Sequence, residues 1–210
     1  MTLLGLISDV HAAPAPVEEA LSIFSKEGVS QVFCAGDIAG YNQQLEQTVK
    51  LLQDNNVQTI IGNHDIKYLN KGEEQSSSLS GKYLQSLPRY IEKKIDGKRF
   101  YMVHSQPPDE NHGGIKLLDK QGLVQSDQID NWQKILKPFD YEVLIVGHTH
   151  QVFSEVIGET LVINPGSTVF NHCCAILSLP DLCVEMIPLS GNKILKTWNW
   201  GEHVIYGKKS

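Results

Sequence analysis

The stretch VQTIIGNHD, residues 57–65, joins a run of strand-forming residues to a glycine and an asparagine, and then to a histidine and an aspartate. An ordinary interpretation exists, because Gly62 and Asn63 favour a turn and Asp65 can cap a following helix. A turn of this kind needs no imidazole and carboxylate side by side. The role of the stretch therefore depends on which other residues the chain places near it.

The first third of the chain alternates between short apolar runs and amphipathic runs. Strands are predicted at residues 2–8, 29–36 and 57–61, with helices over 14–28 and 42–56 between them. In the first helix Val17, Ala20 and Phe24 fall on one face, and Gly28 is placed to end it. This alternation predicts an α/β fold in which right-handed crossovers build a partly parallel sheet.

The second half predicts antiparallel pairing. Three stretches, 90–104, 152–166 and 173–189, each contain two apolar runs joined by a turn signal, of which Asp96-Gly97 is the strongest. A buried strand at 142–147 and a helix over 126–139 complete the pattern. Two polar segments, 67–90 and 105–125, follow candidate site residues, and we expect them to form a wall or a lid of the site.

Composition restricts the classes of function. The chain has 210 residues, 41% of them hydrophobic, which suffices for one domain over 1–210. The net charge of −6 argues against dedicated nucleic-acid binding and against an anionic membrane as partner. No apolar run is long enough to span a bilayer, and LLGLI near the start is too short for a signal peptide. A cytoplasmic protein is the expectation, and homo-oligomerisation is left open.

Potential metal ligands follow five of the predicted strands. The residues are Asp9 and His11, then Asp37, then Asn63 with His64 and Asp65, then His104, and finally His148 and His150. Each residue alone has a commoner explanation as a cap or a turn residue. Together they favour a site, because the carboxyl ends of strands in an open α/β sheet line one crevice. Asp-x-His and His-x-His spacing also directs both side chains to the same side of an extended segment.

The donor types indicate which metals the site would hold. Carboxylates, an amide oxygen and imidazoles suit Mn, Fe, Zn, Co or Ni, and seven such ligands suit two ions bridged by a carboxylate. The four cysteines, Cys34, Cys173, Cys174 and Cys183, are not in metal-binding spacing and are expected in the core. Trp198 and Trp200 are expected to cover a core or an interface.

The ordered set of motifs resembles the calcineurin-like metallophosphoesterase superfamily. The motifs are Asp9-Val10-His11, Gly36-Asp37, Gly62-Asn63-His64-Asp65, the strand end at His104, and Gly147-His148-Thr149-His150. The resemblance implies two mixed β-sheets packed as a sandwich flanked by helices. It also implies that Asp9, His11, Asp37 and His150 hold one divalent metal, and that Asp37, Asn63, His104 and His148 hold the other. Asp37 would bridge the two ions, with manganese favoured, His64 would act as general acid, and Asp65 would orient the His64 ring.

Two further stretches, GDIAGY at 36–41 and NPGS at 164–167, resemble the small bacterial and archaeal phosphodiesterase branch. Ile61 stands where many relatives have arginine, so the arginine clamp of protein Ser/Thr phosphatases is missing. The expected function is hydrolysis of small phosphate esters by a metal-bridging hydroxide, with diesters favoured over monoesters. The alternatives are a phosphomonoesterase using the same site, and a non-catalytic scaffold protein of the same fold.

Overall fold

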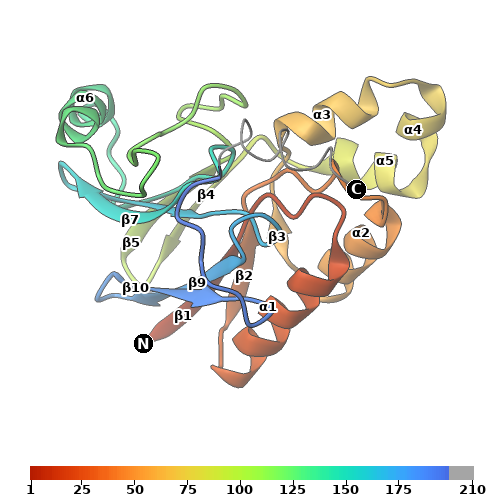
Figure 1. Cartoon of the computed structure of the whole chain (residues 1–210), viewed down its shortest axis with the longest axis horizontal. Helices are drawn as coiled ribbons and strands as arrows, with labels where there is room; N and C mark the ends of the chain where they lie inside the picture. Colours follow the sequence, from red (N-terminus) through yellow and green to blue (C-terminus); the bar gives the residue numbers. More distant parts are fainter. Residues whose placement is uncertain (199–210) are drawn as a thin grey trace.

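The computed structural model describes residues 1–198, and these contain two five-stranded β-sheets (Figure 1). The first sheet has the order β10-β9-β1-β2-β3. Its strands are β1 (Thr2–Ile7), β2 (Gln31–Cys34), β3 (Gln58–Thr59), β9 (Cys173–Leu179) and β10 (Cys183–Pro188). β1, β2 and β3 run parallel, whereas β9 is antiparallel to both β1 and β10.

The second sheet has the order β4-β5-β6-β8-β7. Its strands are β4 (Tyr90–Ile95), β5 (Lys98–Val103), β6 (Val143–Ile145), β7 (Val152–Ile157) and β8 (Thr160–Pro165). β5, β6 and β8 are parallel, and the hairpin partners β4 and β7 are antiparallel to β5 and β8. Asp96 and Gly97 both have positive φ, 47° and 80°, which is the backbone of a two-residue hairpin turn.

The sheets pack face to face, and helices cover their outer faces. The core between the sheets joins Leu6 and Phe33 to Phe100, Met102 and Ile163. The helices are α1 (Pro14–Lys26), α2 (Leu45–Asp54), α3 (Asn63–Leu69), α4 (Glu73–Ser77), α5 (Leu79–Ser86) and α6 (Ser126–Leu136). α1, α2 and α5 bury apolar residues on the first sheet, and α6 buries Trp132 and Leu136 on the second.

The packing of α1 shows how sequence sets these layers. Pro14 starts the helix, where a missing N–H costs nothing, and Phe24 packs against the first sheet at Gly5. A Cβ on Gly5 would lie 2.6 Å from the Phe24 ring. Glycine in the middle of β1 is therefore what allows the helix to approach the strand so closely.

The predicted fold is confirmed: two mixed sheets form a sandwich flanked by helices. Cys34, Cys173 and Cys174 are buried as expected. The expectation for Cys183 was wrong, because this residue lies on the edge strand β10, where its side chain is exposed. No helix within residues 1–198 is long and apolar enough to cross a membrane.

Candidate metal centre

The residues predicted as ligands meet at one edge of the sandwich, where strands of both sheets end. Asp9 and His11 follow β1, Asp37 follows β2, and Asn63 begins α3 after β3. His104 follows β5, and His148 and His150 follow β6. Because β1, β2 and β3 are parallel in one sheet and β5 and β6 in the other, the ends of these strands face the same edge.

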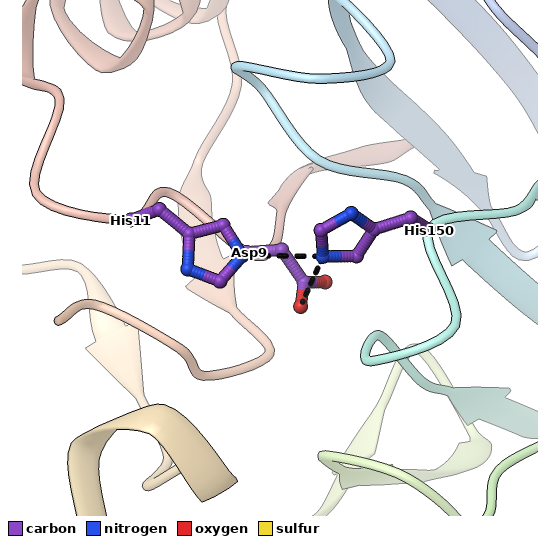
Figure 2. Close-up of side chains that lie close together, drawn as sticks. All are labelled: Asp9, His11 and His150. Carbon is purple, nitrogen blue, oxygen red and sulfur yellow. Dashed lines mark hydrogen bonds and ion pairs between the residues drawn. The ribbon is translucent and has the colours of Figure 1, made fainter. Parts of the chain in front are cut away.

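Asp9, His11 and His150 form the first group of candidate ligands. The Nε2 atoms of His11 and His150 lie 3.1 Å apart, and His150 Nε2 lies 3.4 Å from Asp9 Oδ1 (Figure 2). His11 Nδ1 donates to the carbonyl of Ala39 at 3.2 Å. Since a carbonyl can only accept, Nδ1 carries the hydrogen and the lone pair of His11 lies on Nε2, toward the group.

Asp9, Asp37 and His104 form the second group, and Asn63 and His148 adjoin it. His104 Nε2 lies 3.4 Å from Asp37 Oδ1 and 2.9 Å from Asn63 Oδ1, and His148 Nδ1 is also 2.9 Å from Asn63 Oδ1. His104 Nδ1 donates to the Ala35 carbonyl at 2.7 Å, which directs Nε2 into the site. In both groups the ligand atoms lie within 4.8 Å of one another, and Asp9 is the carboxylate common to the two.

Five of these residues have a left-handed backbone, which non-glycine residues rarely adopt. The φ angles are 50° for Asp9, 44° for His11, 56° for Asp37, 65° for His148 and 49° for His150. Each such residue costs on the order of 1–3 kcal/mol when nothing compensates for it, and strain of this kind clusters at functional sites. The chain therefore accepts local strain in order to direct these side chains toward one another.

His64 and Asp65 lie at the start of α3, beside the ligand groups. The half-buried His64 ring is 5.0 Å from the His11 ring, and its Nε2 is 3.2 Å from the hydroxyl of Tyr41. Both oxygens of Asp65 accept backbone N–H groups, at 2.7 Å from Ala39 and 2.8 Å from Gly62. These bonds match the alternative role for Asp65 at the helix N-terminus. Orientation of the His64 ring by Asp65 remains a prediction.

Comparison with known proteins agrees with this geometry. The family model described as the calcineurin-like phosphoesterase superfamily domain matches residues 2–178. The chain belongs to this superfamily. It is 26% identical over 182 residues to an uncharacterised protein of Methanocaldococcus jannaschii, covering 79% of this chain and 69% of that protein. It is 25% identical over 177 residues to a protein of the same archaeon named a phosphodiesterase, covering 83% and 86%.

A solved structure supports the fold assignment. A hypothetical protein from Pyrococcus horikoshii superposes with a TM-score of 0.71 at 20% identity, over 100% of this chain and 94% of that one. At this identity the likeness concerns the fold alone. The named phosphodiesterase relative agrees with the branch resemblance carried by GDIAGY and NPGS.

In this phosphoesterase the NPGS stretch forms hydrogen bonds that support the segments carrying the candidate ligands. Asn164 Nδ2 donates to the carbonyl of Gly147 and to Thr149 Oγ1, both at 3.0 Å, within the turn that carries His148. Ser167 Oγ donates to the Asp9 carbonyl at 2.6 Å. The sequence marked this stretch by resemblance only, and the structure shows that it fixes the backbone beside two candidate ligands.

Burial and neighbouring charges set the protonation of the ligands. Burial lowers the pKa of His11 to about 4, and burial with the nearby His104 lowers the pKa of His148 to about 4. These rings are therefore neutral and able to bind a metal. Burial also acts to lower the pKa of His104, but the Asp37 carboxylate outweighs it and raises this pKa to about 10. A metal ion that binds His104 must displace that proton.

The donor set fits divalent metals. Imidazole nitrogens, carboxylate oxygens and one amide oxygen converge without a thiolate, and backbone carbonyls fix the Nδ1 hydrogens of His11 and His104. Such a mixture suits Mn, Fe, Zn, Co or Ni. The residues of the two groups could therefore hold a divalent metal.

A cavity of about 360 Å³ opens onto the centre. Its walls include Asp37, Asn63, His64, His148 and His150, together with Tyr41, Lys116, Thr149, Gln151, Thr197 and Trp198. Sequence reasoning missed Tyr41 and Lys116 as site residues. GDIAGY contained a signal for Tyr41, whereas nothing marked Lys116 within the 105–125 segment.

Trp198 lines the cavity and packs on Phe170 with ring centres 4.8 Å apart. Its expected role in covering a core or an interface stays a prediction. Trp200 lies outside the described residues. Two larger cavities, of about 820 and 830 Å³, contain none of the predicted ligands in their walls.

Proposed function

We propose that this phosphoesterase hydrolyses small phosphodiesters at a centre of two divalent ions, with manganese as the favoured metal. One observation carries the proposal: two groups of candidate ligands share Asp9, and the cavity beside them is lined by four predicted ligands together with His64. The groups are Asp9, His11 and His150, and Asp9, Asp37 and His104, and the ligands that line the cavity are Asp37, Asn63, His148 and His150. Asp9, His11 and His150 would hold one ion, and His104, Asn63 and His148 the other, with a carboxylate shared between them. When bound, the two ions would polarise the phosphoryl oxygens and lower the pKa of a water molecule.

The residues of the chain perform the remaining tasks. His64 lies at the cavity wall beside the ligands, where it would give the leaving oxygen the proton that this oxygen needs. Lys116, exposed on the same cavity, supplies a positive charge for the phosphate. Asp65 fixes the turn before α3 through the N–H of Gly62, and so places Asn63 and His64.

The preference for diesters over monoesters rests on two observations. A relative that this chain matches over 83% of its length is named a phosphodiesterase. Ile61 also takes the place before Gly62 where an arginine clamp would stand, so the chain lacks that contact to a phosphate dianion. A small soluble ester is the proposed substrate.

The test uses the whole chain, stripped of metal with a chelator and reloaded with Mn, Ni, Co or Zn. We expect two ions per chain and hydrolysis of bis-p-nitrophenyl phosphate faster than of p-nitrophenyl phosphate. His64→Asn should keep the metal content and lose about 10²–10⁴-fold in kcat. His172→Asn is the matched control, because His172 does not line the cavity. Binding of only one ion, or full turnover by His64→Asn, would contradict the proposal.

A further inference from the structure

A second, smaller cavity of about 210 Å³ adjoins the metal cavity. Its walls are Gly40, Tyr41, His64, Lys67, Tyr68 and Lys71. Tyr41 and His64 also line the metal cavity, so this hydrogen-bonded pair stands between the two spaces. A molecule that reaches past the pair from the metal centre enters a space lined by two lysines and two tyrosines.

The sequence of α3 explains this lining. His64, Lys67 and Tyr68 are spaced by three residues and one, which places them along one side of α3, and Lys71 follows three residues later, just beyond the end of the helix. The Lys71 ammonium lies 5.8 Å from the centre of the Tyr68 ring, within the range of a cation–π contact. This contact draws the Lys71 charge toward the cavity wall.

Neither lysine has a carboxylate partner in the part of the chain that the structure describes. The ion pairs within residues 1–198 involve Lys50, Arg89, Arg99, His104 and His150, but not Lys67 or Lys71. Both side chains belong to exposed residues of a protein whose net charge is −6. Two unpaired ammonium groups beside a cavity attract an anion.

The position of His64 indicates which part of a substrate would carry the anionic group that enters the small cavity. In the proposed function, on which this inference rests, His64 gives its proton to the leaving oxygen. The leaving group therefore lies on the His64 side of the phosphorus, and the small cavity continues in that direction. We infer that the Lys67–Lys71 cavity binds a second phosphate, carried by the leaving group of the phosphodiester.

Two dinucleotides test this assignment: pApA carries a 5′-phosphate, and ApA is the same molecule without that phosphate. Water adds its oxygen to the bridging phosphorus and releases one proton, the bond from phosphorus to the 3′-oxygen breaks, and that oxygen takes the proton from His64. The proton released by water balances the one that His64 gives. The products from pApA are two molecules of 5′-AMP. The opposite orientation would instead release adenosine and adenosine 3′,5′-bisphosphate, so the products report which side leaves.

The experiment measures kcat/KM for pApA and ApA with the Mn-loaded protein and with Lys67→Gln/Lys71→Gln. We expect the wild type to prefer pApA and to release only 5′-AMP from it. The double variant should lose about tenfold of that preference, chiefly through KM, because two exposed ion pairs supply it. Lys26→Gln/Lys134→Gln, which removes two exposed lysines from α1 and α6, should keep the preference.

Equal kcat/KM for the two dinucleotides in the wild type, an unchanged ratio in the double variant, or release of adenosine from pApA would overturn the inference. Turnover of bis-p-nitrophenyl phosphate, which has no second phosphate, tests the proposed function separately from the subsite. If no metal supports that turnover, the dissociation constants of pApA and ApA, measured by calorimetry, decide the subsite alone. Equal constants would then overturn it.

Discussion

Gly147 gives the sharpest test of how the ligands are held. A Cβ at this position would lie 2.0 Å from Ser8 Oγ and 2.7 Å from Asp9 Oδ2, far inside van der Waals contact. The backbone cannot retreat easily, because Gly147 N donates to the His104 carbonyl at 2.8 Å and Gly147 O accepts from Asn164 at 3.0 Å. In Gly147→Ala, Ser8 and Asp9 must therefore move instead.

The size of the effect follows from these contacts. Ser8 and Asp9 are fully buried, and Ser8 Oγ donates to Asp9 Oδ2 at 2.6 Å, so both overpacking and a lost hydrogen bond result. Overpacking of a core costs about 1–3 kcal/mol in the free energy of unfolding. For a chain of this size that lowers Tm by about 2–12 °C. Displacement of a ligand through its supporting residue should weaken Mn²⁺ binding about 10–100-fold.

The assay combines thermal unfolding, followed by circular dichroism, with calorimetric titration of Mn²⁺ into the metal-free protein. Ser8→Ala/Gly147→Ala is the control, because it removes the nearest clashing atom while the new Cβ remains close to Asp9. We expect the double variant to recover much of the lost Tm but little of the lost affinity. A Gly147→Ala protein with Tm within about 1 °C of wild type and unchanged Mn²⁺ affinity would refute the reasoning.

Three further predictions concern the supports of the site, the second sheet and the metals. Asn164→Ala removes hydrogen bonds to Gly147 O, Thr149 Oγ1 and Gly166 N, and at about 1 kcal/mol each should cost roughly 3 kcal/mol in urea unfolding. Hydrogen bonds from Arg99 lower the pKa of Glu142 to about 2, below its ordinary 4.5. The stabilisation is therefore present above pH 4.5 and is lost as the pH falls toward 2. Since the Glu142 side chain is 33% exposed, Glu142→Gln should cost only about 1 kcal/mol at pH 7, and a gap that persists at pH 2 would contradict the assignment. Removal of metal by a chelator should abolish turnover and lower stability by about 2.7 kcal/mol for each of the two ions, relative to Mn²⁺ at 100 times its Kd. An unchanged Tm would argue against a metal centre.

Most of the fold could be predicted from the sequence, because hydrophobic periodicity and turn residues act locally. The apolar run at 2–8 became β1, the amphipathic run at 14–28 became α1, and Asp96-Gly97 became a hairpin turn with two positive φ angles. The convergence of the strand ends followed in turn from the parallel order of the strands.

The roles of individual residues were harder to predict, because they depend on segments that lie far apart in the chain. The family resemblance implies that Asp37 bridges two ions, and this stays a prediction, while the structure adds that Asp9 belongs to both groups of candidate ligands. The role of Asp65 toward His64 stays a prediction, and the structure adds that its two oxygens accept N–H groups from Ala39 and Gly62. Nothing in the sequence near Asp65 indicates that Ala39 lies beside it.

Residue type and local patterning are enough to give the kinds of donor atom and the strand that each one follows. Long-range packing, in contrast, settles which nitrogen of His11 faces the site, and brings His150, 139 positions along the chain, opposite it. The same packing places Lys116 on the metal cavity and Lys67 on the smaller cavity beside it. Packing brings these groups together, and packing depends on the whole core rather than on any single stretch.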